Sequence, residues 1–137
     1  MILQEGQFIH FIPPKLDGNT NNTKKRYLLI LNIDNTTNTI QMLNVSSLKG
    51  KEHKLLYDSN FLIQNYFPLP LPTFVKLDVL YIVHNFKFLS KYIAFNGIKL
   101  NNSEFSIIKS KYSNFIKNNR HLKIITYTKE QIKKLNS

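Results

Sequence analysis

Apolar residues along the first two thirds of the chain gather in short runs separated by polar clusters, a pattern typical of β-strands joined by turns. The run at 27–33 is almost continuously apolar, which predicts a strand buried on both faces. The polar cluster at 34–38 separates it from the run at 39–45, so we expect these two strands to form a hairpin. The predicted strands are residues 7–12, 27–33, 39–45, 53–57, 73–83, 92–95 and 121–127.

Two stretches between these runs are predicted to be loops. Residues 15–25 are rich in Asn and Thr and show no periodicity, and loops of this length are often functional. Residues 67–72 contain three prolines, which remove backbone donors from a sheet. We therefore expect an apolar loop there and no central strand.

One clear helix is predicted after residue 100. Asn101 can cap its start, and Glu104 stands three residues later as the partner in a capping box. Its apolar stripe, which we expect to pack in the core or in a dimer contact, consists of Phe105, Ile108, Tyr112 and Phe115. A short helix capped by Thr128 follows the last predicted strand.

These elements predict a mainly β, α+β fold, a small and strongly curved SH3-like antiparallel β-barrel with a C-terminal helix and a short tail helix. The length of 137 residues suits one domain, residues 1–137, with one hydrophobic core. We find no internal repeat and no linker.

Composition narrows the chemistry. The chain has no cysteine, so disulfides and thiolate metal sites are excluded. Its four histidines are far apart in sequence and none has metal-ligand spacing, so we expect no metal and no cofactor. The start lacks a basic-then-apolar signal segment, and no apolar run approaches the roughly 20 residues of a membrane helix. A cytoplasmic protein without membrane contact is expected.

Charge points to a polyanionic partner. The formal net charge is +11, and such a charge on a small domain favours nucleic acid binding. Residues 1–83 carry eight Lys/Arg against six Asp/Glu, whereas residues 84–137 carry eleven against two. A codon bias toward Lys and Asn would also raise the total, but it explains this asymmetry less well. We expect the last third to attract phosphates most strongly.

Basic and hydroxyl side chains near two strand ends are candidate RNA ligands. Arg26 follows Lys24 and Lys25 where the polar loop meets the apolar strand, and its planar guanidinium suits a phosphate. A solvated basic cluster is the alternative interpretation. Ser46 and Ser47 follow the return strand, where a hydroxyl can donate to a phosphate oxygen or serve only the turn. The candidate RNA-binding residues are Lys24, Lys25, Lys49 and Lys51.

Lys76 and Asp78 are two residues apart in a predicted strand, so their side chains share one face. They could act as a base beside a charge stabiliser, or form an exposed ion pair of little value. Glu104 is better explained as a helix cap. The chain contains no nucleophile elbow, phosphate-binding glycine loop or His-Glu metal motif.

Four motifs in order resemble MazF/PemK-type toxins. Residues 6–8, a polar loop and residues 25–30 resemble the family's first strand, loop and Arg-led second strand. Residues 45–47, Val-Ser-Ser, are similar to its Val-Thr-Ser, and residues 74–78 to the Val-Val-Arg-Cys-Asp of the PemK branch. Residues 97–101 resemble the approach to its C-terminal helix. The resemblance spans roughly residues 5–118, which makes residues 119–137 a C-terminal extension.

The resemblance implies a dimeric SH3-like barrel that cleaves single-stranded RNA without a metal. In this family the 2′-hydroxyl attacks the adjacent phosphate and leaves a cyclic phosphate and a free 5′-hydroxyl. Arg26 matches the catalytic Arg, and Ser46 matches the Thr, with Ser47 as the alternative if the register differs by one. Asp78 matches the proposed base, and Lys76 stands where the PemK branch has Arg. A protein antitoxin is implied, or an RNA antitoxin if the chain resembles the ToxN type.

Several departures limit this comparison. Tyr27 replaces the Pro that follows the family's Arg, the first loop is longer and Asn-rich, and Lys76 lacks the bidentate geometry of Arg. The RNA sequence that is cut cannot be transferred. Two alternatives remain: a non-catalytic barrel that binds single-stranded nucleic acid by Phe/Tyr stacking, and a gyrase poison of the CcdB type. The second lacks support because the chain has no Trp.

Overall fold

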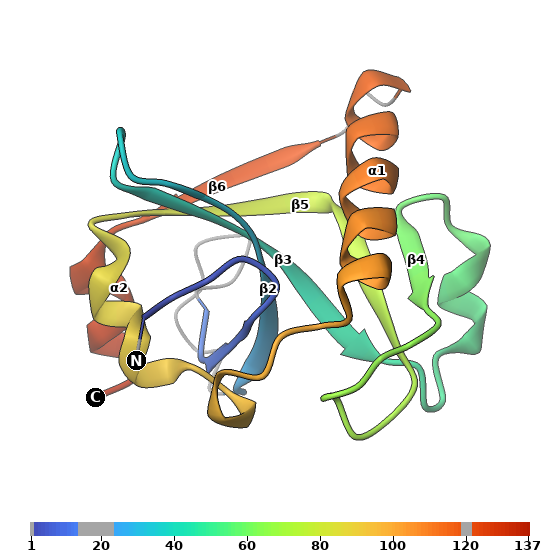
Figure 1. Ribbon diagram of the computed structural model, residues 1–137, viewed down its shortest axis with the longest axis horizontal. Coiled ribbons are helices and arrows are strands. Elements are labelled where there is room, and N and C mark those ends of the chain that lie inside the picture. Colours follow the sequence, from blue (N-terminus) through green and yellow to red (C-terminus); the bar gives the residue numbers. More distant parts are fainter. Residues whose placement is uncertain (1, 14–23, 119–121) are drawn as a thin grey trace.

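The computed structural model describes residues 2–13, 24–118 and 122–137 and shows a mixed α+β architecture (Figure 1). The strands are β1 (Phe8–Phe11), β2 (Arg26–Asp34), β3 (Thr39–Ser47), β4 (Asn60–Ile63), β5 (Thr73–His84) and β6 (Lys123–Tyr127). The α-helices are α1 (Asn102–Asn118) and α2 (Lys129–Leu135), and the 3₁₀ helices are η1 (Glu52–Leu56), η2 (Phe86–Tyr92) and η3 (Phe95–Gly97).

The six strands form one sheet with the order β1–β2–β3–β5–β4. These pairs are all antiparallel, whereas β6 pairs with β5 in parallel. No pairing between β1 and β4 closes this path within the described ranges, so the predicted SH3-like barrel is not confirmed. The predicted all-antiparallel arrangement is wrong for β6.

The long strand β5 carries two different neighbours along one edge. Its first part pairs with β4 up to Lys76, and its second part pairs with β6 from Val79 onward. On the other edge, Leu43 of β3 pairs with Leu80 and Val45 pairs with Val75. Asn44 alone therefore stands opposite residues 76–79. Such an irregularity bends a strand, and β5 turns visibly there (Figure 1).

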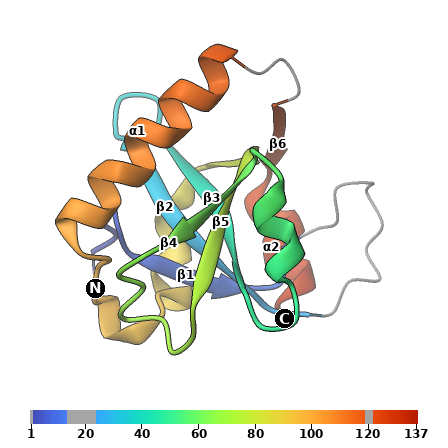
Figure 2. The ribbon, with the colours of Figure 1, turned by 90° about the vertical axis from the view of Figure 1, so that its right-hand side faces the viewer.

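Both faces of the sheet are buried, because successive side chains of a strand point to opposite sides. One core lies beneath α1 and includes Leu29, Val45 and Ile108. The other includes Leu28 of the sheet and Ile132 of α2. Figure 2 shows α1 crossing one side of the sheet, with α2 on the opposite side. The prediction that β2 is buried on both faces is confirmed, since residues 28–31 are at most 4% exposed.

Two predicted strands are wrong, and β4 was not predicted. Residues 53–57 fall mainly in η1, where Leu56 is 84% exposed, so the apolar run there does not mark a buried strand. Residues 92–95 follow the turns of η2 and form only an isolated bridge between Ile9 and Ile93. Phe95 has a φ of 55°, which ends any extended conformation at that point.

The predicted helices and their caps are largely confirmed. The side-chain oxygen of Asn101 accepts a hydrogen bond of 3.1 Å from the Glu104 N–H, as expected for an N-cap. Glu104 does not complete the capping box, because its buried carboxylate accepts a 2.7 Å bond from the Gln64 N–H and joins α1 to the residue after β4. Thr128 and Gln131 form a complete capping box at α2.

Candidate functional site

Four of the predicted catalytic side chains lie on one side of the sheet. Arg26 shares its side with Leu28 and Ile30, which belong to the core beneath α2. Ser46 shares the side of Met42 in the same core. Val75 and Leu77 belong to the core beneath α1. Lys76 lies between them and Asp78 follows Leu77, so both side chains point to the opposite side of the sheet, that of Arg26 and Ser46. The three stretches therefore meet on a common face.

Lys76 is the electrostatic centre of this group. Its side chain is half-buried, and burial is the main cause that lowers its pKa. Arg26, Lys51 and Lys54 lower that pKa further by repulsion, and only Asp78 opposes them. Within the part of the chain that the structure describes, the only ion pair joins Lys109 and Glu5, so none of these cations is neutralised by direct pairing. We call Arg26, Lys51, Lys54 and Lys76 the cation cluster.

Ser46 is tied to this cluster, whereas Ser47 is not. The ammonium of Lys51 donates a 3.3 Å hydrogen bond to the Ser46 hydroxyl. The Ser47 hydroxyl accepts a bond from the Lys49 N–H in the following turn, and Ser47 lies on the opposite side of β3. Of the two serines, Ser46 is thus the one positioned beside the cations.

Sequence reasoning did not predict Lys54 as a site residue, because its segment was predicted to be a strand. In a 3₁₀ helix the side chains at i and i+3 eclipse, so Lys51 just before η1 and Lys54 within it project on the same side. The spacing of the two lysines would have revealed this arrangement if the segment had been recognised as helical.

Asp78 and Tyr81 extend the site along β5. Asp78 raises the pKa of both Lys76 and Tyr81 by its charge, which indicates that it lies near both. Burial is the largest cause of the raised pKa of Tyr81, and Arg26 opposes it. The Tyr81 ring contacts that of Tyr127 at 5.7 Å between centroids. Tyr81 was not predicted as a site residue, and its position three residues after Asp78 gave no signal.

Asn44 contributes a buried acceptor on the same side of the sheet. It lies between Leu43 and Val45 opposite the bend of β5, is 5% exposed, and pairs with Leu28. Its side-chain oxygen has no hydrogen-bond partner among the described residues. An unpartnered buried acceptor costs free energy, so a ligand hydroxyl that reached it would relieve that cost.

The other predicted RNA contacts do not all join the cluster. Lys49 is exposed in the turn after β3, and Lys24 is exposed just before β2. Lys25 lines a different hollow of about 350 Å³ on the side of the first core, together with His10 and Lys91. Burial is the main cause that lowers the pKa of His10, and the charge of Lys25 adds to it.

Three aromatic rings are stacked along that hollow. His10 and Tyr27 lie 4.1 Å apart with an interplanar angle of 9°, and Tyr27 and Phe95 lie 5.1 Å apart at 17°. Phe95 holds a left-handed φ of 55°, which is uncommon for a bulky residue and fixes its ring in this stack. Half-exposed rings beside lysines are the arrangement that proteins use to stack single-stranded bases.

Lysines of the last third of the chain extend the basic surface around the hollow of His10, Tyr27 and Lys91. Repulsion from Lys129 is the first cause that lowers the pKa of Lys133, and Lys91 adds to it. Lys129 also lies over the Phe88 ring at 5.8 Å. These contacts join α2 to η2 in one basic surface, which agrees with the expected excess of charge in residues 84–137.

The predicted loop at 15–25 falls mostly on residues 14–23, outside the described residues. Elsewhere in the described ranges no three His, Asp or Glu side chains come together as metal ligands. No helix of the described segments has the length and apolar character needed to cross a membrane. No protein-family model matches the chain, and no curated protein matches it.

Proposed function

We propose that this protein is a metal-independent endoribonuclease similar to MazF/PemK toxins. It binds a phosphodiester of single-stranded RNA in the cation cluster. The supporting observation is the charge around Lys76, where three cations and one carboxylate surround a half-buried ammonium. Gathering unpaired cations costs free energy in the empty protein, and an anion placed among them removes that cost. A phosphate is the anion that suits Arg and Lys together.

The residues of the cluster can divide the chemistry between them. Asp78 accepts the proton of the 2′-hydroxyl, and the resulting oxygen attacks phosphorus. Arg26, with the Ser46 hydroxyl beside it, stabilises the added negative charge on the phosphorane oxygens. The bond from phosphorus to the 5′-oxygen then breaks. Lys76 protonates that oxygen, and its lowered pKa makes it a better acid than an ordinary lysine. The products are a 2′,3′-cyclic phosphate and a free 5′-hydroxyl.

The finer fold and the biological setting belong to the same proposal. The bend of β5, which carries β4 and β6 on one edge, supports descent from an SH3-like barrel whose sheet has opened. A homodimer and a neutralising antitoxin, a protein or an RNA, follow from the resemblance. Co-expression of the adjacent reading frame or repeat should relieve growth arrest caused by this chain.

The test is incubation of the purified chain with a long single-stranded RNA in EDTA, followed by analysis of the product ends. We expect cyclic phosphates and 5′-hydroxyls. Arg26→Ala should slow cleavage roughly 10²–10³-fold, as for loss of one donor to a developing charge. Lys117→Ala is the matched control, since it removes one exposed positive charge near the end of α1. Intact RNA, or equal cleavage by Arg26→Ala, rejects the nuclease.

A second candidate function is binding of single-stranded nucleic acid without cleavage. The stack of His10, Tyr27 and Phe95 between Lys25 and Lys91 favours it, because such a surface binds bases and phosphates without sequence preference. Salt-sensitive RNA binding that Tyr27→Ala weakens, together with uncut RNA, would support this function over the nuclease.

A further inference from the structure

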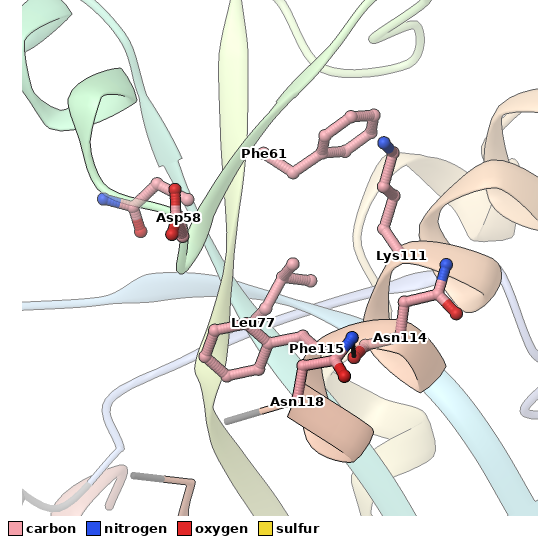
Figure 3. Close-up of a pocket in the computed structure, with 8 residues that line it drawn as sticks. Asp58, Phe61, Leu77, Lys111, Asn114, Phe115 and Asn118 are labelled. Carbon is pink, nitrogen blue, oxygen red and sulfur yellow. Dashed lines mark hydrogen bonds between the residues drawn. The ribbon is translucent and has the colours of Figure 1, made fainter. Parts of the chain in front are cut away.

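A separate hollow lies between the β4–β5 edge and the second half of α1 (Figure 3). Its volume is about 340 Å³, at the small end of the roughly 300–1,000 Å³ that ligand sites occupy. This size suits one planar group better than a long chain. In Figure 3, Phe115 of α1 points toward Leu77 and Lys111 points toward the Phe61 ring.

The inner part of the hollow is apolar. Leu77, 3% exposed, belongs to the core beneath α1, and the half-buried rings of Phe61 and Phe115 pack against that core. The ammonium of Lys111 lies 5.4 Å from the Phe61 ring centroid. Aromatic faces with a cation nearby are typical of sites that stack an unpaired base.

The rim is polar and has free hydrogen-bonding capacity. Within the described ranges, Asp58 forms no side-chain hydrogen bond and no ion pair. The Asn118 side-chain N–H donates a 3.1 Å bond to the Asn114 carbonyl, which leaves the Asn118 side-chain oxygen available as an acceptor. The Asn114 side-chain amide adds one donor and one acceptor. The rim is therefore rich in acceptors.

A carboxylate at such a rim selects one base by chemistry. It accepts two hydrogen bonds and donates none, so it pairs best with two adjacent donors. Guanine alone among the RNA bases presents two adjacent donors, the N1–H and the N2 amino group. Adenine, cytosine and uracil each place an acceptor beside their donor, and that acceptor would face Asp58 and be repelled.

The hollow adjoins the cation cluster through β5. Leu77 lies in its floor, whereas Lys76 and Asp78 on either side point to the other face. Between Lys76 and Val79 the edge of β5 carries neither β4 nor β6, and the Leu77 N–H is bonded to the Ser59 carbonyl at 2.6 Å. The residue before β4 therefore occupies this edge, and the hollow and the cation cluster lie on opposite faces of β5 at neighbouring residues.

Resting on the proposed RNA-binding function, we infer that this hollow binds an unpaired guanine of the RNA, with Asp58 accepting from its N1–H and N2 amino groups. Phe61 and Phe115 supply the apolar contact. The site gives the protein a base preference beside its cation cluster.

The test uses four short 2′-O-methyl oligonucleotides that differ at one position, where the nucleoside is guanosine, adenosine, uridine or inosine. They lack the attacking hydroxyl, so fluorescence anisotropy measures binding without cleavage. We expect the guanine oligonucleotide to bind about tenfold more tightly than the adenine one, the smaller of the effects expected for a bidentate contact. Inosine, which lacks the N2 amino group, should fall between them.

Asp58→Asn should reduce the guanine preference to within about twofold, because the amide loses the second acceptor for guanine and no longer repels adenine. Asp34→Asn is the matched control, because it makes the same charge change at an exposed turn. There the side-chain oxygen accepts hydrogen bonds from the Thr36 and Thr37 N–H groups, and the asparagine oxygen can still accept them. This control should keep the full preference. Asp58 is exposed, so the variant is expected to fold normally.

Equal binding of all four oligonucleotides, or a preference that Asp58→Asn retains, overturns the guanine site while cleavage of unmodified RNA decides the nuclease separately. A guanine preference without cleavage supports the site and rejects the nuclease. Failure to bind any of the four also overturns the guanine site, and the nuclease is again decided by cleavage of unmodified RNA.

Discussion

Replacing Lys76 by methionine should stabilise the protein and weaken its hold on RNA at the same time. Methionine keeps most of the length of the aliphatic chain and removes the charge. In the folded protein Lys76 is half-buried and faces Arg26, Lys51 and Lys54, with only Asp78 in opposition. The charged form is therefore disfavoured by folding, and the neutral variant escapes that penalty.

The size of the gain follows from Coulomb's law. For two like charges about 7 Å apart, at an effective dielectric constant of about 40–80, Coulomb's law gives a repulsion of about 0.6–1.2 kcal/mol. Three repulsions against one attraction leave two unopposed, or about 1–2 kcal/mol. Salt and solvent screen part of this for a half-exposed group, so we expect Lys76→Met to raise the free energy of unfolding by about 1 kcal/mol. The melting temperature should rise by roughly 3–5 °C.

The sign of the pH dependence is fixed by the lowered pKa of Lys76. Between its folded-state pKa and the ordinary lysine value of about 10.4, the unfolded chain binds more protons, so stability of the parent rises with pH in that window. The advantage of Lys76→Met should thus be full at pH 7 and shrink as pH rises toward 10. Lys134→Met, at an exposed position of α2, is the matched control and should show no such advantage.

The assays are urea unfolding at pH 7 and pH 10, and RNA binding over a range of salt concentrations. Loss of one phosphate contact should weaken binding to all RNA sequences alike and reduce the slope of log K against log salt by about 0.7. A variant that is less stable than the parent, or that binds RNA with an unchanged salt slope, would refute the interpretation of Lys76 as a cation that lacks a neutralising partner and binds a phosphate.

Two further variants probe the supports of the site. Asn101→Ala removes the acceptor of the Glu104 N–H at the start of α1 and should lower the free energy of unfolding by about 1 kcal/mol in urea; an unchanged value would show that the cap contributes nothing. Asn44→Val removes the buried side-chain oxygen that lacks a partner and should raise the free energy of unfolding by about 1 kcal/mol, while cleavage of RNA slows. A lower free energy of unfolding for this variant would mean that the Asn44 amide makes a contact that stabilises the protein by more than its unpartnered oxygen destabilises it.

The elements that the sequence predicted correctly are those with a strong apolar pattern and a clear boundary. The hairpin of β2 and β3, the long β5 and the capped helices each combine a clear apolar run or stripe with a turn or cap signal. The segment 53–57 failed because its two adjacent leucines follow no period, and one of them is almost fully exposed. The open sheet was beyond sequence reasoning, since closure depends on how strongly each strand bends and pairs over a distance.

The alternation rule placed Lys76 and Asp78 together, the strand ends indicated Arg26 and Ser46, and the family resemblance added their catalytic roles. None of these could find Lys54, Tyr81 or Asn44, because these join the site through a 3₁₀ turn and a register shift. A shift of this kind leaves no periodic mark in the sequence. The hollow at Asp58 was missed for the same reason, since it depends on α1 lying across the bend of β5.

Charge counted along the sequence pointed to the last third, yet the cation cluster comes from residues 26–76, within a segment of nearly balanced charge. The difference lies in burial. The exposed lysines of α1 and α2 act through solvent, so they steer a polyanion from a distance and lose effect as salt rises. Lys76 is half-buried beside other cations, and desolvation makes each of its interactions stronger at short range. Because the bend of β5 sets that burial, the fold itself decides which few of the nineteen basic residues are partly buried among other cations, as the proposed phosphate site requires.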